Sequence, residues 1–207
     1  DAARGDAVVL IRRGEMPARD EMEALMVARH TPGVHAAVKR ATVGIAGCGG
    51  LGTVVATALA RTGVGRLRLV DFDVVEPSNL NRQQFFVDQI GMLKTQALAE
   101  NLKRMNPYVE IERRDIVLTR ANIPEVFAGC DVVAECFDDP HAKREMTVAV
   151  RTAMRGTPLV TVSGLAGYGP ADEIGVTRIF ENIYLVGDRG TAAGPGCGLM
   201  APRVCVA

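Results

Sequence analysis

The sequence predicts an α/β protein with a Rossmann-like, mostly parallel sheet, helices on both faces, and an antiparallel C-terminal extension. Short apolar runs alternate with helix-patterned segments from residue 41 onward, which is typical of a parallel sheet covered on both sides. A glycine-rich turn follows the first run and opens a helix. After residue 164 two strand-like runs follow each other closely, which predicts an antiparallel pair.

Each element is predicted from its local pattern. Residues 1–40 are charged and helix-prone, with Pro17 suited to a first helical turn and a break at residues 30–33. Helical spacing of apolar residues recurs at 51–59, 93–105, 121–127 and 146–154. Strands are expected at 41–46, 67–70, 108–111, 131–135 and 159–162, and the antiparallel pair at 174–180 and 183–186.

Composition argues against several classes of protein. The 24 basic and 24 acidic side chains cancel, aromatic residues make up only 4%, and no apolar run approaches the ~20 residues of a spanning helix. We therefore expect a cytoplasmic protein without a nucleic-acid or membrane partner. Its five cysteines form no C-x-x-C pair, so no zinc site is expected. Because Asp1 is not a natural start and a new element begins at residue 204, we expect more chain beyond both ends.

The strongest local motif is the G-x-G-x-x-G turn of residues 47–52. Its glycines allow a phosphate to approach the backbone, and the helix that follows offers free N–H groups. Asp71 comes 24 residues after Gly47, at the end of the second predicted strand, where an acid commonly holds ribose hydroxyls. Taken alone, these features favour a dinucleotide-dependent dehydrogenase; the alternative is a glycine turn without a ligand.

The long polar connection after Asp71 favours a different nucleotide. It carries Arg82 to the carboxyl edge of the predicted sheet, Lys94 opens the next helix, and Asp138 and Asp139 follow the fourth strand. Two cations and two carboxylates at one edge fit a nucleoside triphosphate with Mg²⁺ better than a dinucleotide. The alternative is that Arg82 and Lys94 are solvated charges and that Asp138 caps a helix.

Five segments in this order and spacing resemble the ThiF/MoeB/HesA family, relatives of the ubiquitin-activating enzymes: GCGGLG, DFDVVEPSNLNRQQ, GMLK, ECFDD and GLMAPRV. The resemblance covers residues 29–206. It implies an enzyme that binds ATP with Mg²⁺ and adenylates the terminal glycine of a ubiquitin-like carrier protein. It also implies a single domain, with an N-terminal helical segment at 1–40 and an ATP-binding adenylyltransferase domain at 41–207.

The resemblance assigns a role to each matching residue. By this resemblance the nucleotide would be contacted by Gly47, Gly49, Gly50 and Gly52. Asp71 would hold the ribose. The phosphates would be lined by Ser78, Asn79, Leu80, Asn81 and Arg82. Arg82 and Lys94 would neutralise the charge of the phosphates, and Asp138, beside Asp139, would hold Mg²⁺. Arg29 corresponds to the family's N-terminal arginine, which reaches the phosphates of the other protomer, so a homodimer is expected.

Departures from the family pattern narrow the assignment. The two C-x-x-C pairs of MoeB-like members are missing, and Asp139 replaces a common Asn. The SGLAGYG stretch at 163–169 is most similar to the short ThiF-type subgroup, which predicts a ThiS-like sulfur carrier ending in Gly-Gly and a place in thiamine biosynthesis. The alternatives are a MoaD-like carrier, a tRNA-borne carboxylate, an NAD-dependent oxidoreductase and a non-catalytic binding protein. Cys197 has no identifiable base beside it, which favours an incidental loop thiol over a covalent intermediate.

Overall fold

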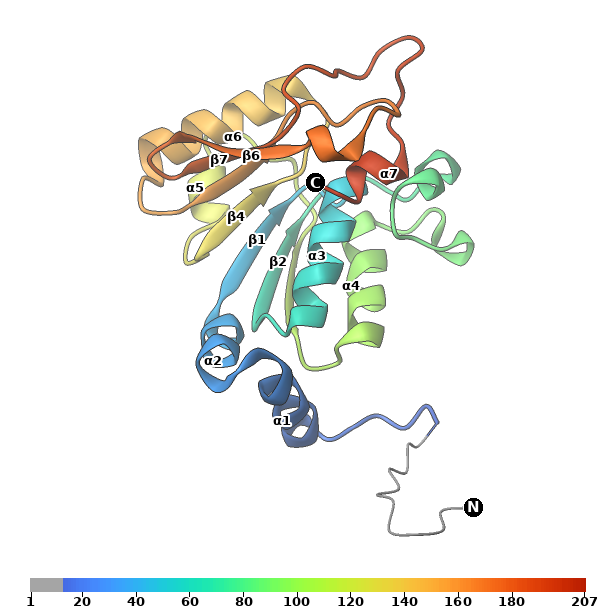
Figure 1. Ribbon diagram of the computed structural model, residues 1–207, viewed down its shortest axis with the longest axis vertical. Coiled ribbons are helices and arrows are strands. Elements are labelled where there is room, and N and C mark those ends of the chain that lie inside the picture. The colour runs from blue at the N-terminus through green and yellow to red at the C-terminus, as the bar shows by residue number, and fades with distance from the viewer. Residues whose placement is uncertain (1–12) are drawn as a thin grey trace.

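The computed structural model describes residues 13–207. Its seven-stranded sheet has the order β3-β2-β1-β4-β5-β7-β6 (Figure 1). Only β6 is antiparallel to its neighbour; the other strands run parallel. The strands are β1 (Thr42–Ala46), β2 (Arg66–Val70), β3 (Glu110–Arg114), β4 (Val132–Glu135), β5 (Leu159–Val162), β6 (Gly175–Phe180) and β7 (Ile183–Gly187). The predicted fold class is confirmed.

Helices cover both faces of this sheet. In Figure 1, α3 and α4 lie in front of the sheet and α5 and α6 lie behind it, while α1 and α2 sit below the amino ends of the strands. The helices are α1 (Arg19–His30), α2 (Pro32–Arg40), α3 (Gly50–Thr62), α4 (Lys94–Met105), α5 (Ile123–Val126), α6 (Pro140–Ala153) and α7 (Ala201–Val204), with 3₁₀ turns at Pro77–Asn81, Val87–Gln89 and Ala171–Glu173. Of the predicted helical segment 1–40, residues 1–12 lie outside the described residues.

The two faces carry separate cores. One joins β1 and β2 to α3 and α4, and the other joins β4 and β5 to α5 and α6. Position 44 in the middle of β1 is a glycine for a steric reason: a Cβ on Gly44 would lie 2.5 Å from Cδ1 of Phe127. The buried ring of Phe127 takes the space that a side chain would need.

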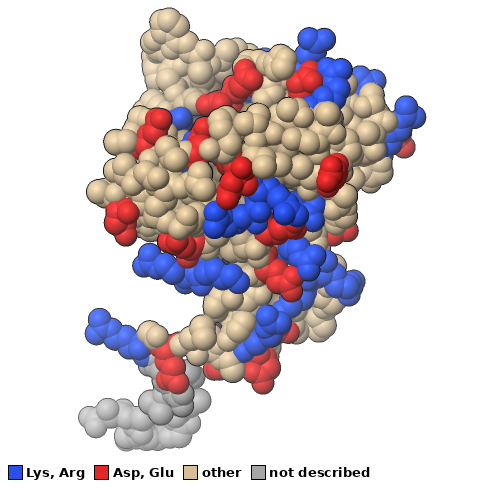
Figure 2. Space-filling model, turned by 180° about the vertical axis from the view of Figure 1, so that it is seen from behind, with Lys and Arg blue, Asp and Glu red and all other residues tan. Residues whose placement is uncertain are grey.

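The third strand differs from its prediction. It occupies Glu110–Arg114 rather than 108–111. Four of its five residues are charged, and Ile111 is its one apolar residue. Arg66 Nη2 lies 2.6 Å from Glu110 Oε2, and Arg68 Nε lies 2.7 Å from Glu112 Oε2. This exposed edge strand has no apolar run that a sequence could reveal. Figure 2 shows basic and acidic side chains lying beside one another across the back of the molecule.

The α4 helix buries its apolar face in its own chain. Ala97, Leu98 and Leu102 are fully covered by the first core. These three side chains are therefore not exposed for contact with a second protomer. Within residues 13–207, no helix has the length and apolar character needed to cross a membrane.

Candidate nucleotide-binding site

The glycine turn joins the carboxyl end of β1 to α3. Gly47 has a φ of +95°, and its N–H donates to the carbonyl oxygen of Val70 at 2.9 Å. A Cβ on Gly52 would lie 1.9 Å from the carbonyl oxygen of Gly47. Both positions therefore require glycine, and the turn brings the first residues of α3 to the carboxyl edge of the sheet.

The start of α3 has unpaired donors. No side chain caps it, and its first backbone bond runs from Thr53 N–H to the carbonyl of Gly49 at 3.0 Å. Within residues 13–207, nothing accepts from the N–H groups of Gly50, Leu51 and Gly52. Free N–H groups at the positive end of a helix dipole suit a phosphate.

Asp71 braces this turn. Its Oδ2 accepts from the N–H of Cys48 at 2.6 Å, and its Oδ1 accepts from the N–H of Asp73 at 2.8 Å. The carboxylate stays partly exposed, so it retains acceptor capacity for ribose hydroxyls. Burial and the nearby Asp71 charge raise the pKa of the Cys48 thiol well above its usual value, so this thiol is a packing group.

The polar connection presents only some of its residues outward. Asn79 is buried, and its Oδ1 accepts from the N–H of Glu76 at 3.0 Å, while Leu80 packs on the first core. Ser78 and Asn81 are exposed, and Arg82 is half-buried. Arg82 Nη1 donates to Asn81 Oδ1 at 2.9 Å, and its Cγ lies 3.5 Å from the position of a Cβ on Gly50. Among the residues predicted to line phosphates, Ser78, Asn81 and Arg82 have accessible side chains.

Lys94 is held at the same edge by an ion pair. It begins α4, and its Nζ lies 2.8 Å from Asp73 Oδ2. The backbone repeats this link, since Lys94 N–H donates to the carbonyl of Asp73 at 2.9 Å. Asp73 N–H donates to Asp71, which also accepts from Cys48 N–H, so the ion pair is linked to the glycine turn through Asp71.

The two aspartates after β4 differ in role. Asp139 caps α6, with its carboxylate accepting from Ala142 N–H at 2.9 Å and His141 N–H at 3.2 Å. These backbone hydrogen bonds lower the pKa of Asp139. Asp138 is exposed and has no hydrogen-bond or ion-pair partner within residues 13–207. The capping role considered for Asp138 therefore belongs to Asp139.

These residues fit a magnesium nucleotide. Mg²⁺ in such sites is held by one or two carboxylates together with phosphate oxygens, and Asp138 is free to serve. Within residues 13–207, no three His, Cys, Asp or Glu residues gather as a ready-made metal cage. The arrangement suits a metal that arrives with its nucleotide.

The ThiF family model matches residues 23–188. The chain belongs to the ThiF family. The resemblance indicated by the sequence motifs is thus confirmed at the level of the family, which replaces the dinucleotide-dependent dehydrogenase suggested by the glycine motif alone.

Curated relatives in this family are larger proteins. The adenylyltransferase and sulfurtransferase UBA4 of Eremothecium gossypii is 38% identical over 148 residues, which are 70% of this chain and 33% of that protein. The adenylyltransferase and sulfurtransferase MOCS3 of Bos taurus is 42% identical over 126 residues, which are 60% of this chain and 27% of that protein. The chain spans about a third of the length of these relatives.

A solved structure shares the fold of this ThiF-family chain. The E. coli tRNA N6-threonylcarbamoyladenosine dehydratase TcdA, in complex with ATP, superposes with a TM-score of 0.80. The identity is 23%, and the match covers 88% of this chain and 87% of that one. This likeness shows a common fold.

Glu135 belongs to the site's framework and was missed from the sequence. It ends β4 and is 1% exposed. Its Oε1 accepts from Phe137 N–H at 2.7 Å and from Lys143 Nζ at 2.9 Å, and its Oε2 accepts from Thr161 Oγ1. It thereby fixes the loop that carries Asp138. An acid at the end of an apolar strand was the available signal.

The C-terminal segment also reaches the glycine turn. Arg203 in α7 is 1% exposed and donates to Asp188 Oδ2 at 2.5 Å and to the carbonyl of Pro170 at 2.7 Å. Its neighbour Val204 has a Cγ1 3.0 Å from the position of a Cβ on Gly50. Hydrogen bonds from this buried arginine therefore tie α7 to residues 164–188, and Val204 of the same helix contacts the start of α3.

Arg29 is the one predicted site residue that lies elsewhere. It is exposed near the end of α1, below the amino ends of the strands, whereas the glycine turn lies at their carboxyl ends (Figure 1). It is not brought together with the other site residues of its own chain. Its expected action on a second protomer stays a prediction.

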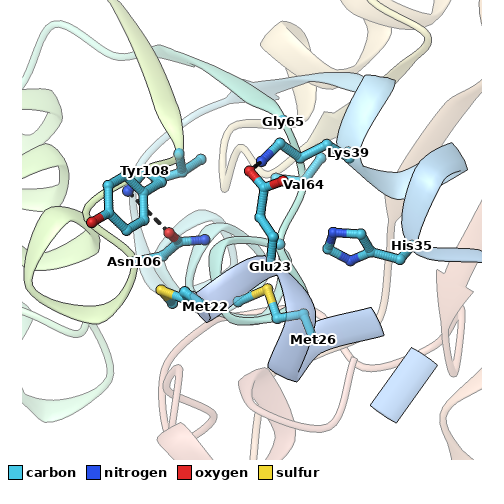
Figure 3. A pocket seen from close by; sticks show the side chains of 11 residues that line it. Met22, Glu23, Met26, His35, Lys39, Val64, Gly65, Asn106 and Tyr108 are labelled. Atoms are coloured by element: carbon cyan, nitrogen blue, oxygen red, sulfur yellow. Dashed lines mark hydrogen bonds and ion pairs between the residues drawn. The ribbon is translucent and has the colours of Figure 1, made fainter. Parts of the chain in front are cut away.

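A cavity of about 20 Å³ lies at this amino edge, where α1 and α2 meet the core (Figure 3). An ion pair between Glu23 and Lys39 crosses it, and the Lys39 hydrogen bond lowers the pKa of Glu23. His35 is buried on its wall, with no partner for either ring nitrogen within residues 13–207. The cavity has room for a single water molecule and is separate from the nucleotide site.

Proposed function

We propose that this chain binds ATP with Mg²⁺ and adenylates the C-terminal glycine of a small ubiquitin-like sulfur carrier ending in Gly-Gly. The observation that carries the proposal is the convergence at one sheet edge of the cations Arg82 and Lys94 with N–H groups of α3 and the Asp138 carboxylate, which have no partner within residues 13–207. The ThiF-family relatives named as adenylyltransferases support the same chemistry.

The chemistry is an in-line displacement at phosphorus. The carrier's terminal carboxylate attacks the α-phosphorus of ATP, a new acyl–phosphate bond forms, and the bond to pyrophosphate breaks. Arg82 and Lys94 neutralise negative charge on the phosphates, and the N–H groups of α3 orient them. Asp138 would hold Mg²⁺, which when bound would further neutralise charge on the pyrophosphate. No protein nucleophile is required for this step.

A ThiS-like carrier of thiamine biosynthesis is the proposed substrate, on the resemblance at residues 163–169. The structurally similar TcdA is named as a tRNA-modifying enzyme, so a carboxylate carried on tRNA is the second candidate substrate. The balance of 24 basic and 24 acidic residues and the mixed charges in Figure 2 favour the protein carrier, since tRNA binding usually relies on an excess of basic surface.

The active form is proposed to be a homodimer. Arg29 stands far from its own glycine turn and can assist the phosphates only from another protomer. Exposed apolar side chains near the polar connection offer surface for such a contact, namely Phe72, Val74, Phe86, Val87 and Ile90.

The decisive test is ATP–pyrophosphate exchange with purified partners. We expect exchange that depends on a Gly-Gly-ended carrier and on Mg²⁺, together with a mass gain on the carrier that corresponds to an adenylyl group. A carrier lacking its last glycine is the matched control and should not support exchange. Exchange supported by tRNA and not by any carrier would move the assignment to the second candidate. No exchange with either acceptor would reject the adenylyltransferase proposal.

A further inference from the structure

The carboxylate of Glu135 is a buried charge at the end of β4. Its side chain is fully covered, whereas the side chain of its ion-pair partner Lys143 on α6 is 22% exposed. Its Oε1 accepts from Phe137 N–H at 2.7 Å and from Lys143 Nζ at 2.9 Å, and its Oε2 accepts from Thr161 Oγ1 on β5. Donors from the loop after β4, from α6 and from β5 thus meet at one buried carboxylate.

Stability alone does not account for a charge at this place. Moving two charges out of water is unfavourable, and replacing a buried ion pair by apolar side chains of similar volume is often neutral or stabilising. The two residues before Glu135, Val133 and Ala134, are buried and apolar, so an apolar side chain would continue the pattern of the strand. The carboxylate therefore points to a role other than filling the core.

The residues that follow β4 lie directly against the glycine turn. The N–H of Cys136 donates to the carbonyl of Ala46 at 2.8 Å. A Cβ on Gly47 would lie 3.1 Å from the carbonyl oxygen of Cys136 and 3.3 Å from Cδ1 of Phe137. A shift of this loop would therefore change the place of Asp138, the next residue, relative to the turn.

The loop is also held on both sides of Asp138. On one side Glu135 accepts from the N–H of Phe137, and on the other Asp139 accepts from two N–H groups in the first turn of α6. Asp138 itself is exposed and has no hydrogen-bond or ion-pair partner within residues 13–207. Its backbone is thus fixed by its neighbours, while its carboxylate stays available for a ligand.

We propose that Glu135 is a positioning residue: through Phe137 it fixes Asp138 beside the glycine turn, where Asp138 would hold Mg²⁺ on the phosphates. This rests on the proposed adenylyltransferase function. Groups that orient a metal ligand commonly contribute ten- to a hundredfold to metal affinity, so without the Glu135 carboxylate the Mg²⁺ concentration for half-maximal ATP binding should rise about 10-fold or more. ATP binding without Mg²⁺ does not use Asp138, so its affinity should stay within about twofold of wild type.

The test measures binding and needs no turnover. Titration calorimetry gives the affinity for ATP in excess EDTA and over a range of Mg²⁺ concentrations. Glu135→Met removes the carboxylate and keeps a side chain of similar volume, so it should shift the Mg²⁺ dependence. Glu145→Met is the matched control, because it breaks another ion pair of α6, in which Arg120 Nη2 lies 2.6 Å from Glu145 Oε1. This control should bind ATP with the Mg²⁺ dependence of wild type.

A double variant separates positioning from stability. Glu135→Met combined with Lys143→Met replaces the whole ion pair by apolar side chains, so its melting temperature should lie near that of wild type. If Glu135 positions Asp138, the Mg²⁺ dependence of ATP binding stays shifted in the double variant. Recovery of the wild-type Mg²⁺ dependence together with the melting temperature would overturn the inference. An equal loss of ATP affinity with and without Mg²⁺ would overturn it too.

Glu135→Gln makes the same comparison if the methionine variants do not fold. Its neutral oxygen accepts more weakly from Phe137 N–H than a carboxylate does, so a shift of the Mg²⁺ dependence in the same direction is expected. An unchanged dependence in Glu135→Gln would then reject the positioning role. A wild type that binds no ATP, or binds it equally well with and without Mg²⁺, rejects the proposed function itself, which is a distinct outcome.

Discussion

Lys94→Met separates the catalytic and structural roles of this lysine. The Lys94 side chain is 10% exposed and its Asp73 partner is 49% exposed, so their ion pair at 2.8 Å reaches solvent on one side. Such a pair contributes about 0–1 kcal/mol to stability. Removing a group that stabilises developing charge on phosphate costs ~10²-fold or more in rate, which corresponds to roughly 2.7 kcal/mol. The loss in activity should therefore be several times the loss in stability.

Two measurements check this, namely carrier-dependent ATP–pyrophosphate exchange and urea unfolding. Methionine keeps most of the aliphatic stem of Lys94, so packing is preserved. Asp73→Asn is the matched control, because it breaks the same ion pair and leaves the cation in place; its exchange should stay within a few-fold of wild type. Near-normal exchange by Lys94→Met would refute the assigned role. An equal loss in both variants would mean that the ion pair, and not the ammonium charge, matters.

Four further outcomes are expected. Arg82→Ala should lower the same ATP–pyrophosphate exchange by ~10²-fold, and normal exchange would contradict this. It should change stability by less than about 0.5 kcal/mol, because the only side-chain hydrogen bond of Arg82 within residues 13–207 is to the adjacent residue. Asp138→Ala should fold normally and fail to exchange pyrophosphate at any Mg²⁺ concentration, whereas Asp139→Ala should lose about 1 kcal/mol of stability as a helix cap. Hydrogen bonds from Thr191 hold the pKa of Asp188 at about 2, below its ordinary 3.8. This carboxylate therefore stabilises the fold above about pH 4, and that stability is lost as the pH falls toward 2. Asp188→Asn should make the free energy of unfolding in urea less dependent on pH between these values. Sedimentation should find a dimer at micromolar concentration, and a fully active monomer would reject the dimer.

The sequence was sufficient for the strand and helix alternation because that signal is local. Apolar spacing marks α3 and α6 clearly, and the glycines at 47 and 52 are required by the backbone itself. It was insufficient for β3, whose charged residues carry no apolar period. Periodicity also shows that α4 has an apolar face but does not show what covers it, and the structure buries that face in the first core.

For the site, the sequence by itself determined the residue types and their family, and the tertiary structure decided which of them meet. Parallel register places Ala46 beside both Val70 and Glu135, so residues that follow three different strands gather at one edge. Packing alone pairs Glu135 with Lys143 and makes Asp139, not Asp138, the cap of α6. In the part of the chain that the structure describes, it leaves Asp138 and the side-chain oxygen of Gln83 without a partner. The physical reason is that motif spacing reports contacts along one turn or strand. Partners supplied by distant segments depend on how helices pack on the sheet, and that is set by the whole core.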